Sequence, residues 1–132
     1  MGAAWIVSAL PPEVPFVTVE RDAERAAAVR ELFRDDENVR VLEGDWHVLM
    51  PPEAPFDLLF YDGGGKQHPA RDGDELIGLL APRGLVVMDD LTPGRPREGD
   101  PVREFWLDHP ELAAVEVTVS PSMAVILAAR TV

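Results

Sequence analysis

Short apolar runs alternate with helix-like segments along most of this chain. The first four runs lie at 16–20, 39–43, 56–61 and 85–89, and most of their positions are apolar. Runs of this kind are typical of parallel strands, because helices cover both faces of such a sheet. The pattern therefore predicts an α/β fold in which these runs are parallel strands joined by helices.

Helices are predicted between these strands. Asp22 is suited to cap a helix over 23–34. Apolar residues recur at helical spacing in this segment and should form its buried stripe: Ala26, Val29, Leu32 and Phe33. Proline and glycine mark the limits of the other helices, which we expect at 3–10, 46–50, 69–80 and 101–108.

The last two apolar runs, 112–119 and 123–130, are predicted to form an antiparallel hairpin. The connection Ser120-Pro121-Ser122 is too short for a crossover helix, and a connection of this length joins antiparallel strands. The whole chain therefore predicts the order β-α-β-α-β-α-β-α-β-β. This order gives a mostly parallel sheet with one antiparallel strand.

Size and charge narrow the possible functions. The 132 residues are expected to form a single domain, 1–132, since domains most often hold about 100–150 residues. The net charge of −12 argues against nucleic acid as the main partner and favours a neutral or cationic ligand. The chain has no cysteine, which excludes disulfides and thiol catalysis. No run reaches the roughly 18 apolar residues of a membrane span, and the first residues lack the basic region of a signal peptide, so we expect a cytoplasmic protein without membrane contact.

Acidic residues follow the predicted strands. Glu20 ends the first strand, Asp62 follows the third, and Asp89 and Asp90 end the fourth. After the second strand comes Glu43-Gly44-Asp45. Since open α/β sheets bind ligands outside the carboxyl ends of their strands, this row of carboxylates predicts a site for hydroxyls, amines or a metal.

The same segments resemble a known family. The matching motifs are Val-Thr-Val-Glu-Arg-Asp at 17–22, Leu-Glu-Gly-Asp-Trp at 42–46, Phe-Asp-Leu-Leu-Phe-Tyr-Asp-Gly-Gly at 56–64, and Leu-Ala-Pro-Arg-Gly-Leu-Val-Val-Met-Asp-Asp at 80–90. Their order and spacing resemble the class I S-adenosylmethionine-dependent methyltransferases, and within them the small, catechol-type O-methyltransferases. The resemblance implies a Rossmann-like sheet, S-adenosylmethionine as cofactor, and methyl transfer to an oxygen of a small-molecule substrate.

The resemblance also implies the cofactor-binding residues. Glu20 would hold both ribose hydroxyls, which suits a carboxylate because it accepts two hydrogen bonds in one plane. Asp45 would accept the adenine amine, Trp46 would shield the ring, and Gly2 would be a remnant of the glycine-rich turn. Alternatives stay open: Glu20 ends a strand and caps a helix, Asp45 caps the turn that follows it, and Trp46 belongs to the core.

A second set of residues corresponds to the family's metal site and base. Asp62, Asp89 and Asp90 would bind Mg²⁺, which would hold a catechol-like diol. As an alternative, Asp62 and Asp89 are strand-end acids that face the methionine amine of the cofactor. Lys66 resembles the family's lysine base, although it stands four residues after Asp62 instead of the usual three. His68 is a second candidate base.

One part of the family pattern is missing. The family order is 3-2-1-4-5-7-6, and this chain begins after strand 1 and its Glu-x-Gly-x-Gly turn. The apolar side chains of such a strand would contribute about 8–15 kcal/mol. We therefore expect either direct pairing of 16–20 with 56–61 or a partner chain over the gap, and in either case a homodimer with weak cofactor affinity. A truncated product of a longer reading frame is a third alternative.

Two other functions remain in competition with a methyltransferase. A methyltransferase-like module without its cofactor turn could act only by binding or as a structural part. An NAD-type dehydrogenase would also use Glu20 on a ribose. The closing hairpin and the Gly44-Asp45 turn disfavour the dehydrogenase.

Overall fold

A computed structural model of the protein describes residues 2–62 and 68–132. The chain forms two compact units, Met1–Glu53 and Ala54–Val132. The expectation of a single domain over 1–132 stays a prediction. None of the helices in the described residues is long and apolar enough to cross a membrane.

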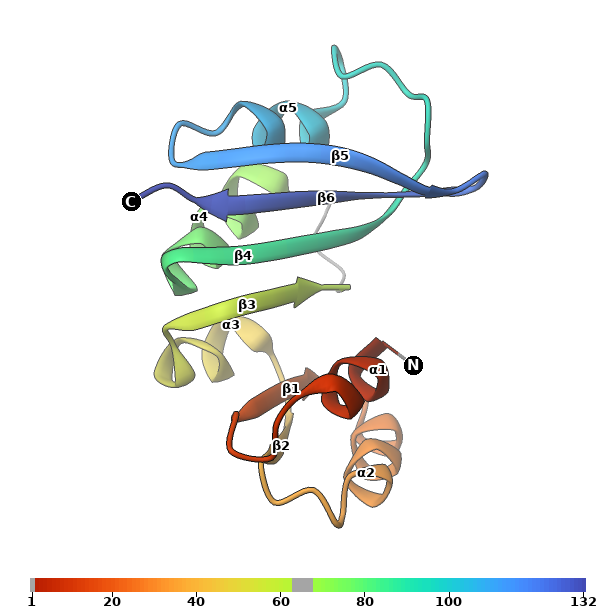
Figure 1. The fold of residues 1–132 in the computed structure, drawn as a ribbon, viewed down its shortest axis with the longest axis vertical. Helices are drawn as coiled ribbons and strands as arrows, with labels where there is room; N and C mark the ends of the chain where they lie inside the picture. Colours follow the sequence, from red (N-terminus) through yellow and green to blue (C-terminus); the bar gives the residue numbers. More distant parts are fainter. Residues whose placement is uncertain (1, 63–67) are drawn as a thin grey trace. The chain divides into compact units, whose positions relative to one another are not determined.

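The first unit contains a two-stranded parallel sheet, in which β1 (Phe16–Glu20) pairs with β2 (Val39–Glu43). Both strands have the predicted bounds. Their register runs from Phe16 opposite Val39 to Glu20 opposite Glu43, so the two strands end side by side. The helices of this unit are α1 (Gly2–Ala9), α2 (Ala23–Leu32), α3 (Trp46–Leu49) and the 3₁₀ turn η1 (Pro51–Glu53) (Figure 1).

Helix α2 begins as predicted but buries a narrower stripe. The Arg25 N–H donates to the Asp22 carboxylate at 2.9 Å, which confirms Asp22 as the N-cap. Ala26 and Phe33 are buried, whereas Leu32 is 62% exposed, so its predicted burial was wrong. At 3.6 residues per turn, Leu32 lies about 100° around the helix from Phe33 and falls outside the buried face.

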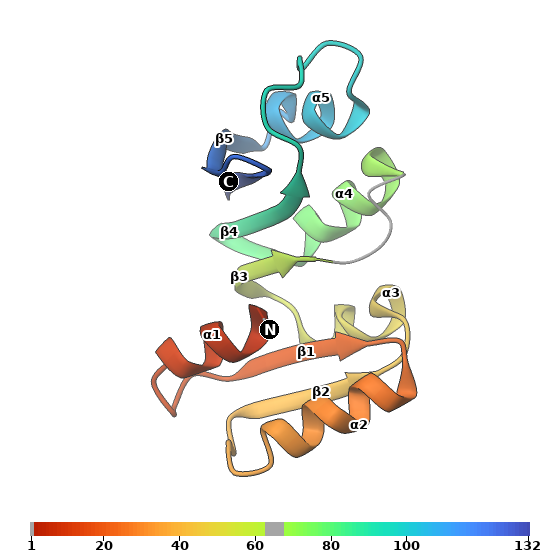
Figure 2. The ribbon, with the colours of Figure 1, turned by 90° about the vertical axis from the view of Figure 1, so that its right-hand side faces the viewer.

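The second unit is a four-stranded sheet with the order β3-β4-β6-β5. Strands β3 (Phe56–Tyr61) and β4 (Leu80–Leu91) are parallel. Strand β6 (Met123–Arg130) is antiparallel to both β4 and β5 (Leu112–Ser120), which confirms the predicted hairpin. Helices α4 (Pro69–Leu79) and α5 (Pro101–Asp108) lie on the same face of this sheet (Figure 2).

Strand β4 is longer than predicted. The sequence Pro82-Arg83-Gly84 indicated an end to the preceding helix and a strand over 85–89. In the structure, Leu80 already pairs with Phe56, and a register shift separates this pair from Leu58 opposite Leu85. Arg83 takes a left-handed φ of 66° within the irregular segment. The irregular segment Pro82-Arg83-Gly84 therefore lies within β4 and does not precede it.

Burial alternates along the strands of the second unit. Val86, Met88, Ile126 and Trp106 are at most 1% exposed and form the centre of the core. The intervening strand positions point to the other face of the sheet. Several of them are exposed large apolar residues: Leu58, Phe60, Leu85, Val115 and Leu127. The sheet is therefore apolar on both faces.

Each sheet reproduces part of the expected strand order. In the family numbering, β2-β1 corresponds to 3-2, and β3-β4-β6-β5 corresponds to 4-5-7-6. Among the described residues, β1 pairs with β2 and β3 pairs with β4. The direct pairing of 16–20 with 56–61, one of the predicted alternatives, is not among these pairings.

Candidate functional site

The carboxyl ends of β1 and β2 lie side by side and are joined by a hydrogen bond. The Gly44 N–H donates to the Glu20 carbonyl oxygen at 3.0 Å, which ties the residue after β2 to the end of β1. Gly44 has a φ of +144°, and a Cβ there would lie 2.9 Å from Leu49 Cδ1. The backbone conformation therefore favours glycine at this position, and a side chain there would also displace Leu49.

Glu20 lies at this edge with its carboxylate turned toward the following loop. The Asp22 N–H donates to Glu20 Oε1 at 2.9 Å. Within the described part of the chain, Oε2 accepts no hydrogen bond. The local bond supports the alternative that Glu20 organises the start of α2, and it leaves one oxygen for another donor.

Asp45 is held at the same edge by the residues around it. It is the N-cap of α3, where its Oδ1 accepts the His47 backbone N–H at 3.0 Å and lies 2.8 Å from His47 Nδ1. Arg21 Nη2 lies 3.8 Å from Asp45 Oδ2. The His47 side-chain hydrogen bond is the largest cause that lowers the pKa of Asp45. The predicted capping role of Asp45 is therefore confirmed, and its carboxylate is kept ionised.

Trp46 lies next to this carboxylate. Its ring stacks on the His47 ring with centroids 3.8 Å apart and planes 25° from parallel. Trp46 is half-buried, which fits neither a core side chain nor a free surface ring. The structure thus brings Glu20, Asp45 and Trp46 to the carboxyl end of one parallel strand pair.

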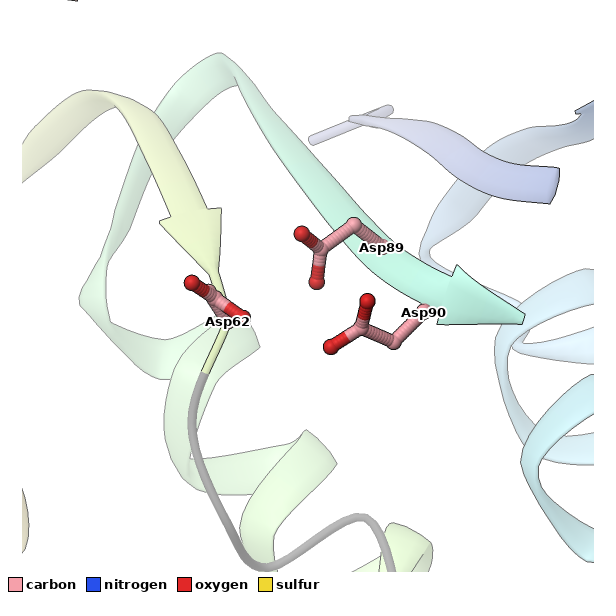
Figure 3. A group of neighbouring side chains, drawn as sticks. All are labelled: Asp62, Asp89 and Asp90. Atoms are coloured by element: carbon pink, nitrogen blue, oxygen red, sulfur yellow. The ribbon is translucent and has the colours of Figure 1, made fainter. Parts of the chain in front are cut away.

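The second unit brings three carboxylates together. Ligand oxygens of Asp62, Asp89 and Asp90 all lie within 4.8 Å of one another (Figure 3). Tyr61 is opposite Met88 in the parallel register, so the two strand ends meet at one edge. The predicted proximity of Asp62 and Asp89 is confirmed.

An irregularity in β4 explains how two consecutive residues reach the same place. Successive side chains of a regular strand point to opposite faces. Asp90 instead has a left-handed φ of 59°, and the pairing with β6 shifts between Met88 and Leu91. Both carboxylates therefore point toward Asp62 (Figure 3). Few non-glycine residues adopt this conformation, Asp more readily than most, and such residues cluster at functional sites.

The donor set fits a hard cation. Carboxylate oxygens are the ligands that Mg²⁺ prefers, and Mg²⁺ usually takes one or two of them and completes its shell with water or substrate. Asp62 and Asp90 are exposed and Asp89 is half-buried, so water and substrate have access. Next to this cluster, burial is the main cause that raises the pKa of Tyr61 to about 12, so its phenol stays neutral.

Arg103 is a buried residue that was not predicted from the sequence. Arg103 is 1% exposed, and it donates to both Glu116 oxygens at 2.8 Å and to Asp100 at 2.6 Å. It also donates to the Thr92 carbonyl at 2.6 Å, two residues after Asp90. Arg103 lies one turn from Trp106 on the buried face of α5, and this i, i+3 spacing was the available signal.

The other predicted site residues are Gly2, His68 and Lys66. Gly2 is the first residue of α1, and its contact with a cofactor stays a prediction. His68 is exposed at the N-cap position of α4, where its side chain makes no capping hydrogen bond. Lys66 lies outside the described residues, so its role as a base also stays a prediction.

Comparison with known proteins gives one family match and one curated relative. A family model described as a methyltransferase domain matches residues 1–91. The protein-L-isoaspartate O-methyltransferase of Methanopyrus kandleri is 31% identical over 108 residues, which cover 80% of this chain and 43% of that protein. The chain thus spans less than half the length of this relative.

Solved structures share the fold. The O-methyltransferase TomG of Streptomyces achromogenes, solved with SAM, has a TM-score of 0.78 at 23% identity, over 97% of this chain and 67% of that chain. The O-methyltransferase of Bacillus cereus, solved with SAH, has a TM-score of 0.77 at 20% identity, over 96% and 67%. These matches confirm the predicted Rossmann-like, mostly parallel fold with one antiparallel strand.

Proposed function

We propose that this chain, which belongs to the family of methyltransferase domains, binds S-adenosylmethionine and directs its methyl group to an oxygen of a small-molecule acceptor. The observation that carries this proposal is the pair of carboxylates, Glu20 and Asp45, at the carboxyl end of the β1–β2 pair. Ligands of open α/β sheets bind at this edge. TomG and the Bacillus cereus protein are both O-methyltransferases, and this supports oxygen as the acceptor atom.

The proposed roles follow from the chemistry of each side chain. Glu20 accepts hydrogen bonds from the two ribose hydroxyls through its outward oxygen. Asp45, kept ionised by His47, accepts the adenine amine. Trp46 offers an apolar ring edge beside the base. Together these contacts would fix the nucleoside end of the cofactor and leave its methyl group for the acceptor.

The acidic cluster provides the second half of the proposal. Asp62, Asp89 and Asp90 would hold Mg²⁺ through their oxygens, and the ion would supply Lewis acidity to a vicinal diol of the acceptor. The cofactor supplies an activated methyl group on its sulfonium. The acceptor hydroxyl must lose its proton as the new carbon–oxygen bond forms, and Lys66 and His68 are the proposed recipients. Most of the catalysis would come from positioning.

A calorimetric titration tests this function directly. S-adenosylhomocysteine and NAD are each titrated into the parent protein and into Asp36→Asn. This control variant loses one negative charge from an exposed loop of the first unit. We expect binding of S-adenosylhomocysteine by both proteins and none of NAD. Preference for NAD would support the dehydrogenase alternative, and binding without turnover of any catechol or isoaspartyl acceptor would support the binding module. If neither ligand binds, the proposed function is rejected.

We also propose that the protein acts as a homodimer, with a second copy covering the outward face of the second sheet. Outward positions of β5 and β6 at 113, 115, 117, 125, 127 and 129 are all apolar. Two chains with a net charge of −12 repel each other, so an apolar surface without charged residues favours their association. Light scattering should give a dimer, and Leu127→Lys should give a monomer. A monomeric parent protein would rule this interface out.

A further inference from the structure

The Asp45 carboxylate presents two unequal oxygens. His47 contacts only Oδ1, through its backbone N–H at 3.0 Å and its ring Nδ1 at 2.8 Å. Oδ2 faces Arg21, whose Nη2 is 3.8 Å away and whose side chain is 84% exposed. An exposed pair at this distance contributes little. The orientation of the carboxylate is therefore set by His47.

The same contact defines the protonation state of the histidine. An ionised carboxylate only accepts hydrogen bonds, so His47 Nδ1 must carry a proton. The stacked Trp46 ring, 3.8 Å from the imidazole, holds the plane of His47. When one oxygen of a carboxylate is held by hydrogen bonds and its plane is fixed, the other oxygen keeps a constant direction. A selective hydrogen-bond acceptor needs such a fixed direction.

From this geometry we infer that His47 is a positioning residue that aims Asp45 Oδ2 at the 6-amino group of a purine nucleoside and makes the site select 6-amino over 6-oxo purines. The inference rests on the proposed function, in which Asp45 contacts the adenine of the cofactor. An amino group donates to the carboxylate, whereas a 6-oxo group presents a second acceptor and repels it. His47 itself does not touch the base in this arrangement.

The expected selectivity follows from the cost of losing one charge-assisted hydrogen bond. Such a bond corresponds to about a 10-fold to 100-fold change in affinity. The parent protein should therefore bind S-adenosylhomocysteine about 10-fold to 100-fold more tightly than S-inosylhomocysteine. When Asp45 can turn freely, the difference should fall to a few-fold.

Three substitutions separate the hydrogen bond from the stacking. His47→Phe keeps a ring on Trp46 and the backbone N–H but removes the side-chain donor, while His47→Asn restores a side-chain donor near the position of Nδ1. Arg21→Gln removes the weak contact to Oδ2 and serves as the matched control. Each variant is titrated with both nucleosides, and its fold is checked by circular dichroism.

We expect selectivity in the parent and Arg21→Gln proteins, loss of selectivity in His47→Phe, and partial recovery in His47→Asn. A merely structural role would weaken both nucleosides equally and leave their ratio unchanged. If the parent protein is selective and His47→Phe is equally selective, the inference is wrong while the proposed function stands. If the parent protein binds neither nucleoside, the proposed function fails, and the inference fails with it.

Discussion

Replacing Arg103 by methionine should strongly destabilise the second unit. The Arg103 side chain is 2% exposed and pairs with Asp100 and Glu116, whose side chains are 21% and 23% exposed. Methionine fills a similar volume but leaves two partly buried carboxylates without their cation. Breaking a buried ion pair from one side costs about 3–5 kcal/mol. Because water reaches both carboxylates, we expect a somewhat smaller cost, about 2–4 kcal/mol.

Urea unfolding followed by far-ultraviolet circular dichroism measures this cost. The matched control is Arg97→Met, which removes an arginine that pairs with Asp108 where both side chains are about half exposed. A surface pair of this kind contributes at most about 1 kcal/mol. A cost below about 1 kcal/mol for Arg103→Met, or equal costs for both variants, would refute the reasoning.

The same variant should change how stability depends on pH. Hydrogen bonds from Arg103 are the main cause that lowers the pKa of Glu116, and they outweigh partial burial in lowering the pKa of Asp100. Groups with a lowered folded pKa stabilise the protein above their unfolded pKa, about 4, and lose this contribution as the pH falls. Stability should therefore fall more steeply below about pH 4 in the parent protein than in Arg103→Met. Equal slopes would contradict the assigned pairing.

Two glycines in α4 and the acidic cluster provide the remaining predictions. Gly73→Ala should cost about 1–3 kcal/mol, because the added Cβ would overlap the Phe105 ring of α5. Gly78→Ala has open space and should stabilise the protein by about 0.5–1 kcal/mol. Thermal unfolding of both variants measures these changes, and equal shifts would argue against the close α4–α5 contact. Asp62→Asn and Asp89→Asn should each weaken Mn²⁺ binding, followed by water proton relaxation, by about tenfold, the scale of a lost charged ligand bond. Methyl transfer that persists unchanged after complete chelation would remove the metal from the proposal.

Much of the fold was predictable because the strands are short and apolar, and because proline, glycine and acidic residues mark their ends. The bounds of 16–20, 39–43 and 56–61 matched, and the cap Asp22 was predicted from local chemistry alone. Strand β4 was misread because Arg83 adopts a left-handed conformation that its residue type does not announce. Tertiary pairing decides such positions.

The site was predictable to a different degree. The clustering of Asp62 with Asp89 followed from parallel pairing, whereas Asp90 was included only because the family resemblance implied it, and the register shift that brings it there has no local sequence signal. Arg103 was missed because arginine is almost never buried unless paired, and its partner Glu116 lies on the next strand, β5, where its side chain is read from the sequence as an exposed charge. Pairings across the fold are where sequence patterns carry the least information.

The most direct test of the central claim is the affinity of Glu20→Ala for S-adenosylhomocysteine, measured by calorimetry beside the parent protein and Asp36→Asn. If Glu20 holds the ribose, the substitution should cost about 1.5–3 kcal/mol, a 10-fold to 100-fold loss of affinity, while Asp36→Asn binds like the parent. Unchanged affinity in Glu20→Ala would contradict the proposed cofactor site at the end of β1.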